Sequence, residues 1–469
     1  MATSEQFDVA VLGSGPGGYV AAIRAGQLGL KTAIIERDSV FGGTCLHRGC
    51  IPTKAFLHSA DLIDEIRHAS THGIVAADPR VDMKTVLARK TKVVSQLAGG
   101  VKGLLRKNKV TTFNGKGTLA GKDSIAVTAE GKETATVRAK HIVLATGSEV
   151  RAIPSLKTDG KVVLNSDHIL NLAEVPATML VIGAGAVGVE FASIFLRFGT
   201  KVTLVEMLDR LVPIEDAEVS RELERLFKKQ GMDCRPGTSV TQLEVKNGKA
   251  EVVLKDKEGK ETRATYDKVL VAVGRQPNTQ GNGFAENGVK MTKETVDVDA
   301  HFKTSVPNIF AIGDIIKGPW LAHAASHEGI HVMHEIAGKP LEETMSFLKV
   351  PNATYCYPEV ASIGLTEAQA KEKGYDVVVS KFPFVGIGKA LILDQTDGFV
   401  KIVSEKKYHE VLGVHIIGPK ATELISPASV AMAHEATAES LAHAVQAHPT
   451  LAESIGEAAH GVYGMAIHY

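Results

Sequence analysis

Long hydrophobic runs, a net charge and a large set of cysteines are what this chain of 469 residues lacks. No apolar run reaches the roughly 18 residues that a membrane-spanning helix needs. Basic and acidic side chains number 53 each, so the formal net charge is zero, and no basic tract predicts binding to nucleic acid or to a membrane surface. An apolar strand begins almost at once, which leaves no room for a secretion signal. We therefore expect a cytoplasmic protein, with a trimmed organellar form as the alternative.

Only four cysteines occur, which excludes a disulfide-rich secreted scaffold. Two of them, Cys45 and Cys50, lie together in the string GGTCLHRGCIPTK. On a regular helix, residues five apart hold their Cα atoms about 8.6 Å apart, beyond the roughly 6.8 Å that a disulfide tolerates. A bridged pair therefore needs a distorted turn, for which the glycines of this string supply the backbone freedom.

The surroundings of the two cysteines favour a reactive dithiol. Cys50 is expected near the N-terminus of the following helix, where Pro52 suits the opening turn. The positive end of that helix, together with Arg48 and Lys54, is expected to favour a thiolate. Two buried structural thiols are the alternative interpretation of the spacing. In a reducing compartment the pair is better explained as a dithiol that exchanges electrons with a bound cofactor.

A strand, a glycine loop, a helix and a second strand follow one another twice along the chain. The copy FDVAVLGSGPGGYVAAIRAGQLGLKTAIIER ends with Glu36 and the copy TMLVIGAGAVGVEFASIFLRFGTKVTLVE with Glu206. This order places a pyrophosphate on a helix N-terminus and a carboxylate on ribose hydroxyls. Two copies predict two dinucleotides, as in a flavoprotein that exchanges hydride with a nicotinamide. The loop glycines are Gly13, Gly15 and Gly18 in the first copy and Gly183, Gly185 and Gly188 in the second.

Two further acidic residues bear on the cofactors. Glu206 would hydrogen-bond an adenosine ribose and repel a 2′-phosphate, which favours NAD over NADP. A solvated strand end is the alternative, because Arg210 follows closely. A third apolar strand, NIFAIGDII, ends at Asp314, which is either an acceptor for a sugar hydroxyl of a cofactor or an ordinary turn residue.

From about residue 350 the pattern changes to strand-like runs followed by helical stretches. It predicts an antiparallel sheet covered by helices, an α+β unit that serves as an interface. Near its end, His448 precedes a proline and Glu453 falls in the first turn of the terminal helix, where the carboxylate can fold back to orient the imidazole as a general base. An ordinary surface histidine beside an acid that complements the helix dipole is the alternative.

In this order, GGTCLHRGCIPTK, both glycine fingerprints, ATGS, VGRQPNT, NIFAIGD and HPTLAE resemble the pyridine nucleotide-disulfide oxidoreductase family over nearly the whole chain, and its lipoamide branch in particular. The resemblance implies an α/β fold with two Rossmann-like dinucleotide-binding domains, for FAD and NAD, and a C-terminal α+β dimerisation domain. The expected parts are a FAD-binding domain over 1–149, an NAD-binding domain over 150–278, a central domain completing the FAD site over 279–349 and an interface domain over 350–469.

The family's catalytic roles carry over to matching positions. Cys45 would exchange with the substrate, and Cys50 would lie against the flavin. His448 with Glu453 would form an acid-base dyad that acts on the other subunit's disulfide. The remaining implied positions are Lys54 with Glu190 as an ion pair near the reactive edge of the flavin ring, Glu36, Gly43, Thr44, Gly117, Thr146, Gly147, Asp314 and Ala322 as FAD contacts, and Val240 and Gly274 as NAD contacts.

The implied activity is oxidation of protein-bound dihydrolipoamide with reduction of NAD⁺. The implied partners are a second copy of the chain and the lipoyl domains and E2 acyltransferase core of a 2-oxo acid dehydrogenase complex, or the H protein of glycine cleavage. No metal is expected in the site. A glutathione or mycothione reductase, or a non-catalytic flavoprotein scaffold, is the alternative; a mercuric reductase is disfavoured because a C-terminal vicinal cysteine pair is missing.

The chain departs from the family pattern at four positions. His47 and Arg48 stand where Asn and Val are common, and we expect their positive potential to make the Cys45 thiol more acidic than in a relative with Asn and Val. Ala324 and His327 stand where a lysine and a glutamate are frequent, which leaves the electrostatics on the flavin side of that helix open.

Overall fold

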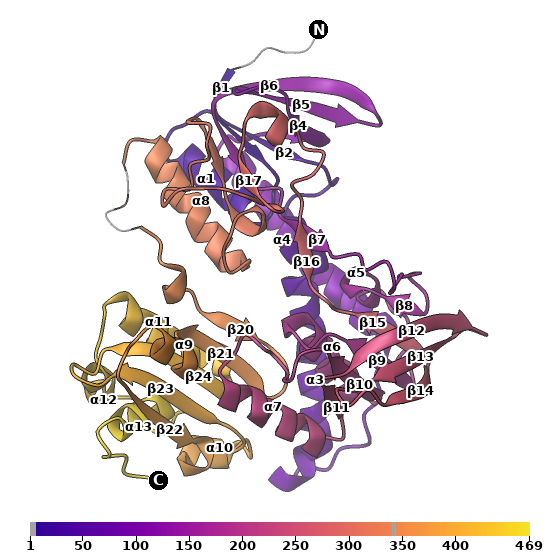
Figure 1. Ribbon diagram of the computed structural model, residues 1–469, viewed down its shortest axis with the longest axis vertical. Helices are drawn as coiled ribbons and strands as arrows, with labels where there is room; N and C mark the ends of the chain where they lie inside the picture. The colour runs from indigo at the N-terminus through magenta and orange to yellow at the C-terminus, as the bar shows by residue number, and fades with distance from the viewer. Residues whose placement is uncertain (1–5, 340, 342–343) are drawn as a thin grey trace. The chain divides into compact units, whose positions relative to one another are not determined.

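The computed structural model describes residues 6–339, 341 and 344–469. The chain forms two compact units, each assembled from segments that are distant in the sequence. Figure 1 traces the chain through both. The first unit comprises Met1–Ala55, Thr85–Arg151 and Arg275–Phe347, and the second comprises Phe56–Lys84, Ala152–Gly274 and Leu348–Tyr469.

The first unit is built on one mixed sheet in the order β3-β2-β1-β6-β5-β4, with β19 also paired to β6. Strands β3, β2, β1, β6 and β19 run parallel, whereas β5 pairs antiparallel with the first half of β6 and β4 pairs antiparallel with β5. Helices α1 and α8 pack against each other (Figure 1). The strands are β1 Gln6–Leu12, β2 Thr32–Glu36, β3 Thr111–Asn114, β4 Lys116–Leu119, β5 Ser124–Ala129, β6 Lys132–Leu144 and β19 Ile309–Ala311. The helices are α1 Pro16–Gln27, α2 Gly43–Arg48, α4 Met83–Lys107 and α8 Ala322–Ile336.

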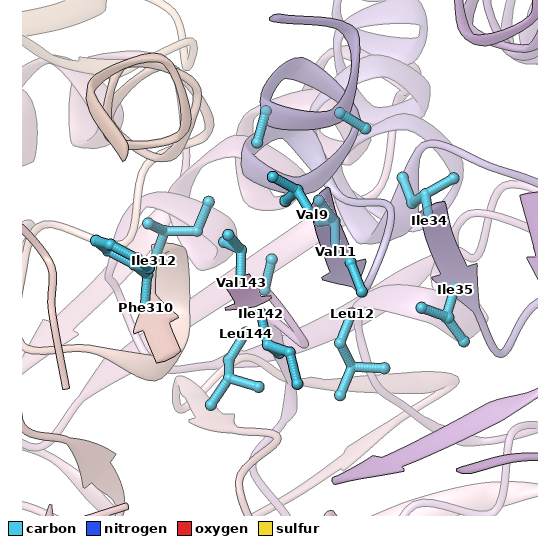
Figure 2. Packing of buried hydrophobic residues seen from close by; sticks show 14 of the residues in the cluster. Val9, Val11, Leu12, Ile34, Ile35, Ile142, Val143, Leu144, Phe310 and Ile312 are labelled. Carbon is cyan, nitrogen blue, oxygen red and sulfur yellow. The ribbon is translucent and has the colours of Figure 1, made fainter. Parts of the chain in front are cut away.

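The parallel strands carry near-continuous apolar runs because both faces of a parallel sheet are covered. Figure 2 shows Val11 of β1, Ile34 of β2, Val143 of β6 and Phe310 of β19, all fully or almost fully buried. The third apolar strand is shorter than the sequence predicts, because after β19 the backbone turns into the 3₁₀ turn Gly313–Ile315. This packed sheet gives the loops at its carboxyl edge a rigid base.

The second glycine loop belongs to a parallel five-stranded sheet in the order β11-β10-β9-β15-β8. An antiparallel meander, β12-β13-β14, follows β11 in the chain. The strands are β8 Val163–Leu164, β9 Thr178–Ile182, β10 Lys201–Glu206, β11 Asp233–Pro236, β12 Ser239–Lys246, β13 Lys249–Lys255, β14 Glu261–Tyr266 and β15 Lys268–Val271. The helices are α5 Ser166–Ile169, α6 Ala186–Phe198 and α7 Ala217–Lys229, and two short strands of the first unit, β7 Ser148–Val150 and β16 Arg275–Pro277, pair antiparallel.

The C-terminal part is an antiparallel sheet in the order β20-β21-β24-β23-β22 covered by helices, which confirms the architecture expected beyond residue 350. The strands are β20 Asn352–Thr354, β21 Glu359–Gly364, β22 Val377–Pro383, β23 Phe399–Glu405 and β24 Val411–Gly418. The helices are α9 Glu367–Glu372, α10 Gly388–Ile392, α11 Ala421–Ala433, α12 Ala438–His443 and α13 Glu453–Gly461. Among the helices that the structure describes, none is long and apolar enough to cross a membrane.

A buried lysine fixes helix α7 to this C-terminal sheet. The side chain of Lys401 on β23 is 1% exposed, and its Nζ lies 3.1 Å from Asp216, 2.9 Å from Glu218 and 2.8 Å from Glu367. Asp216 also caps α7 by accepting a hydrogen bond from the Glu218 backbone N–H. One ammonium group therefore contacts two carboxylates at the start of α7 and a third at the start of α9.

Candidate active site

The first glycine loop is tightly packed at Gly18 and borders open space at Gly15. A Cβ on Gly18 would lie 2.0 Å from the Gly13 carbonyl oxygen, so only glycine allows this approach of helix to strand. A Cβ on Gly15, the residue before α1, would meet no atom within 4 Å. The N-terminal amides of α1 thus border open space, which fits a dinucleotide pyrophosphate.

The second loop repeats this arrangement. A Cβ on Gly188 would lie 1.8 Å from the Gly183 carbonyl oxygen, whereas one on Gly185 would meet no atom within 4 Å. The two loops therefore have the same arrangement of close-packed and open glycines, and each borders open space where a dinucleotide can bind.

Each loop is also tied to the acid at the end of the next strand. The Glu36 carboxylate accepts hydrogen bonds from the Ser14 backbone N–H at 2.8 Å and from its hydroxyl at 2.5 Å. The Glu206 carboxylate accepts them from the N–H groups of Ala184 at 2.7 Å and Leu208 at 3.0 Å. Both acids thus lie beside their loops, as ribose binding requires.

Arg210, which left the coenzyme preference open, is engaged within its own loop. Its Nη2 donates a hydrogen bond to the Pro213 carbonyl oxygen at 2.8 Å. The carboxylate of Glu206, in contrast, lies at the loop and the strand end. This placement favours NAD, because an anion beside the ribose repels a 2′-phosphate.

The two cysteines lie in two consecutive helices, Cys45 in a short one and Cys50 at the start of a long one. Cys45 lies in α2, and Cys50 begins α3, Cys50–His68, after a break at Gly49 with φ −135° and ψ −111°. This break distorts the turn between the two cysteines, as a bridged pair would require. The two thiols are hydrogen-bonded to each other. Helix α2 begins against the first glycine loop, since a Cβ on Gly43 would lie 2.5 Å from the Gly15 Cα.

The surroundings of Cys45 raise its pKa and give Arg48 and His47 other partners. The hydrogen bond with Cys50 and burial raise the pKa of the Cys45 thiol, although the charge of Lys54 acts in the opposite direction. Arg48 does not supply the expected field, because its Nη2 lies 2.8 Å from an Asp38 carboxylate oxygen. His47 likewise faces its own loop, with Nε2 2.9 Å from the Phe41 carbonyl oxygen. The expectation that Cys45 is more acidic than in a relative with Asn and Val at positions 47 and 48 stays a prediction.

Ser148 joins three of the segments that the sequence marks. Its hydroxyl donates to the Asp314 carboxylate and accepts from Arg275 Nε at 2.7 Å, while its carbonyl accepts from Arg275 Nη2 at 2.6 Å. Thr146 is bonded in turn to Asn278, its hydroxyl donating to the Asn278 carbonyl at 2.7 Å. Asp314 is thus a fixed acceptor. Ser148 and Asn278 escaped the sequence-based selection, although they lie in the strings ATGS and VGRQPNT.

The remaining positions predicted to contact cofactors lie at element ends or on strands. Gly117 lies on β4, where a Cβ would come within 2.3 Å of Leu12, so its backbone packs closely against β1. Ala322 begins α8, Val240 lies on β12 and Gly274 follows β15 with φ +108°. Thr44 on α2 reaches the segment around Ser148, and Gly147 has a positive φ of 66°.

Glu190 and Lys54 belong to different units, and each is described by its own surroundings. Glu190 on α6 is 5% exposed, and its carboxylate accepts a hydrogen bond from the Tyr355 backbone N–H at 2.9 Å. Lys54 on α3 acts on the charge of Cys45. Their pairing stays a prediction.

The His448 imidazole is oriented by Glu453. Nδ1 lies 2.8 Å from Glu453 Oε1, and Glu453 Oε2 accepts the Thr450 backbone N–H at 2.8 Å. Burial opposes ionisation of Glu453, but the hydrogen bonds from His448 and Thr450 outweigh it and lower the Glu453 pKa. The His448 side chain is 78% exposed. With Nδ1 held by a carboxylate, Nε2 is presented to a partner as a proton acceptor.

Comparison with known proteins covers the whole chain. Residues 7–329 match the family described as "Pyridine nucleotide-disulphide oxidoreductase", and residues 350–459 match its dimerisation domain. The dihydrolipoyl dehydrogenase of Bacillus subtilis is 42% identical over 99% of both chains. The mitochondrial dihydrolipoyl dehydrogenase of Pisum sativum is 41% identical over 99% of this chain and 93% of its own. The crystal structure of LpdA from Mycobacterium tuberculosis matches with a TM-score of 0.89 at 26% identity, covering 97% of this chain and 99% of that one.

Proposed function

The chain belongs to the pyridine nucleotide-disulfide oxidoreductase family, in agreement with its motifs, and on that premise we propose that it oxidises dihydrolipoamide with NAD⁺ as the final acceptor. The observation that carries the proposal is the contact between helix α2, which holds Cys45, and the first glycine loop, where Gly43 meets Gly15. It supports a site in which Cys45 and Cys50 lie beside the loop that would hold the FAD pyrophosphate. The curated relatives of similar length carry the same activity in their names.

The side chains divide the work. In the oxidised enzyme Cys45 and Cys50 would form a disulfide. His448, oriented by Glu453, accepts a proton from a substrate thiol, and the resulting thiolate attacks the Cys45 sulfur, which breaks the Cys45–Cys50 bond and releases Cys50 as a thiolate. The second substrate thiol displaces Cys45, so the substrate leaves as a disulfide and Cys45 and Cys50 carry its two electrons. FAD, when bound, transfers two electrons between the dithiol and NAD⁺.

The cofactor sites follow from the two loops. Gly13, Gly15, Gly18, Glu36 and Asp314 would hold FAD, with Gly43, Thr44, Gly117, Thr146, Gly147 and Ala322 around it. Gly183, Gly185, Gly188 and Glu206 would hold NAD, with Val240 and Gly274 beside it. Lys54 and Glu190 would face each other near the reactive edge of the flavin ring.

The assembly follows from the match to the dimerisation domain over residues 350–459, which supports a homodimer. In that dimer His448 would serve Cys45 of the other subunit. Lipoyl domains and the E2 acyltransferase core of a 2-oxo acid dehydrogenase complex, or the H protein of glycine cleavage, would deliver the substrate. The division at residues 149, 278 and 349 is part of the same proposal.

Anaerobic titration of the purified protein with dihydrolipoamide, followed by NAD⁺, tests the reaction. We expect a long-wavelength charge-transfer absorbance on reduction and stoichiometric NADH after NAD⁺ is added. The variant Cys45→Ser should keep its bound flavin but form no NADH from dihydrolipoamide. Absence of NADH from the wild-type protein would refute the activity, and faster turnover of NADPH with glutathione or mycothione disulfide would assign the chain to another branch.

A further inference from the structure

Glu328 is a buried acid in the first unit to which the reaction assigns no task. It lies on α8 and is 2% exposed. Carboxyl groups are seldom buried so fully without a cation. Within the part of the chain that the structure describes, no ion pair to Glu328 is found. A buried carboxyl in that situation tends to hold its proton.

The carboxyl group is fixed to the turn that carries Asp314. Glu328 Oε2 accepts a hydrogen bond from the Gly313 backbone N–H at 2.6 Å. Gly313 has φ +73° and opens the 3₁₀ turn Gly313–Ile315, so this bond sets the turn at its first residue. The Asp314 carboxylate receives the Ser148 hydroxyl. Glu328 therefore determines where Asp314 lies.

Burial raises the pKa of Glu328 to about 7, the negative charge of Asp314 adds to the shift, and the bond from Gly313 opposes it. The proton of Glu328 is consequently exchanged close to neutral pH. Ionisation places a second negative charge beside Asp314, at the edge of the sheet where the first glycine loop lies.

We propose that Glu328 is a positioning residue of the FAD site, which holds the Gly313–Asp314 turn and couples the binding of FAD to the uptake of a proton. The inference rests on the proposed FAD site. FAD brings two phosphate charges, and an ionised Glu328 adds to the negative charge that they meet. FAD binding therefore favours the protonated acid, and affinity falls as the pH rises.

The size of the effect follows from linkage. If FAD binding raises the Glu328 pKa by about one unit above 7, affinity weakens about fivefold between pH 6 and pH 8. The same shift requires uptake of about half a proton per FAD at pH 7.5. The other ionisable groups on the packed elements are Asp314 on the turn, Tyr19 and Arg24 on α1, and His323, His327, His331, His334 and Glu335 on α8.

Glu328→Gln separates these groups, because its amide oxygen still accepts the Gly313 N–H but cannot ionise. FAD binding to the full-length apoprotein is measured by flavin fluorescence from pH 6 to pH 8. We expect Glu328→Gln to bind about fivefold more tightly than wild type at pH 8 and equally at pH 6. Glu335→Gln, which removes an acid paired with Lys303 near the other end of the same helix, should keep the wild-type profile.

Proton uptake on FAD binding to the wild-type apoprotein, measured in weakly buffered solution with a pH indicator, gives a second test that needs no variant. Uptake near half a proton at pH 7.5 supports the proposal. No uptake, or identical pH profiles for wild type and Glu328→Gln, overturns it. Failure of the wild-type apoprotein to bind FAD at any pH would instead refute the proposed function.

Discussion

Replacement of Lys401 by methionine gives the sharpest test of how helix α7 is held. The side chain is 1% exposed and its Nζ contacts three carboxylates at 2.8–3.1 Å. Methionine fills similar volume but removes the ammonium group beside Asp216 and one of the two lysine contacts of Glu218 and of Glu367. Breaking a buried ion pair from one side costs about 3–5 kcal/mol.

Lys381→Met is the matched control. Lys381 lies directly opposite Lys401 in the sheet and also contacts Glu218 at 2.9 Å, but its side chain is 47% exposed. Exposed pairs contribute about 0–1 kcal/mol. At about 2 °C per kcal/mol for a unit of this size, we expect Lys401→Met to lower Tm by roughly 6–10 °C and Lys381→Met by less than about 2 °C. Thermal scans at one fixed protein concentration measure this.

The pH dependence has a definite sign. Burial alone would raise the pKa of Glu218, but hydrogen bonds from Lys401 and Lys381 hold it at about 2. The stability that Glu218 contributes is thus present above its unfolded pKa and lost as the pH falls towards 2, reduced in size by its partial exposure. In Lys401→Met, Glu218 has lost one of its two lysine contacts and takes up a proton more readily, so the gap in Tm should be smaller at pH 5 than at pH 7.5. Equal losses in both variants, or a gap unaffected by pH, would refute the reasoning.

Two further predictions concern the reacting groups. Glu453→Gln should lower kcat in the dihydrolipoamide assay by about 10²-fold, because the carboxylate that orients His448 is lost. The control Glu457→Gln removes an equivalent partner from His468 at 2.8 Å and should leave kcat within about twofold. Similar losses of kcat in both variants would contradict the role of Glu453. Arg48→Val should leave the pH profile of Cys45 alkylation by iodoacetamide almost unchanged, since Arg48 is paired with Asp38. Lys54→Met, in contrast, should move the profile to higher pH. A clear shift for Arg48→Val would show that the charge of Arg48 does reach the thiol.

Both dinucleotide folds and the C-terminal sheet could be predicted because their signals are local. Each glycine loop lies between its own strand and helix, and the acids Glu36 and Glu206 end the next strands within the same short segment. The Glu453 carboxylate reaches His448 across only five positions. Periodicity and spacing are sufficient where all partners lie within one supersecondary unit.

The surroundings of charged side chains could not be predicted in the same way. Arg48 lies two residues from Cys50 in the sequence, yet its guanidinium turns to Asp38. Glu328 is buried against Gly313, and Lys401 meets Asp216 at a separation of 185 residues. A charge pattern read along the chain gives the sign of a group but not the direction in which tertiary packing turns it, and that direction decides its effect on the site.

The hydrogen bonds that tie Glu206 to Ala184 and Leu208 have a consequence for attempts to change the coenzyme. Exchanging this acid for a small or basic residue, to admit a phosphorylated ribose, would also remove the acceptor that holds the loop and the chain beyond β10. Coenzyme selectivity and loop rigidity therefore depend on the same side chain. A redesigned enzyme that accepts NADP needs a neutral hydrogen-bond acceptor in the place of Glu206. Without one, the loop loses its fixed conformation and must be ordered each time a coenzyme binds.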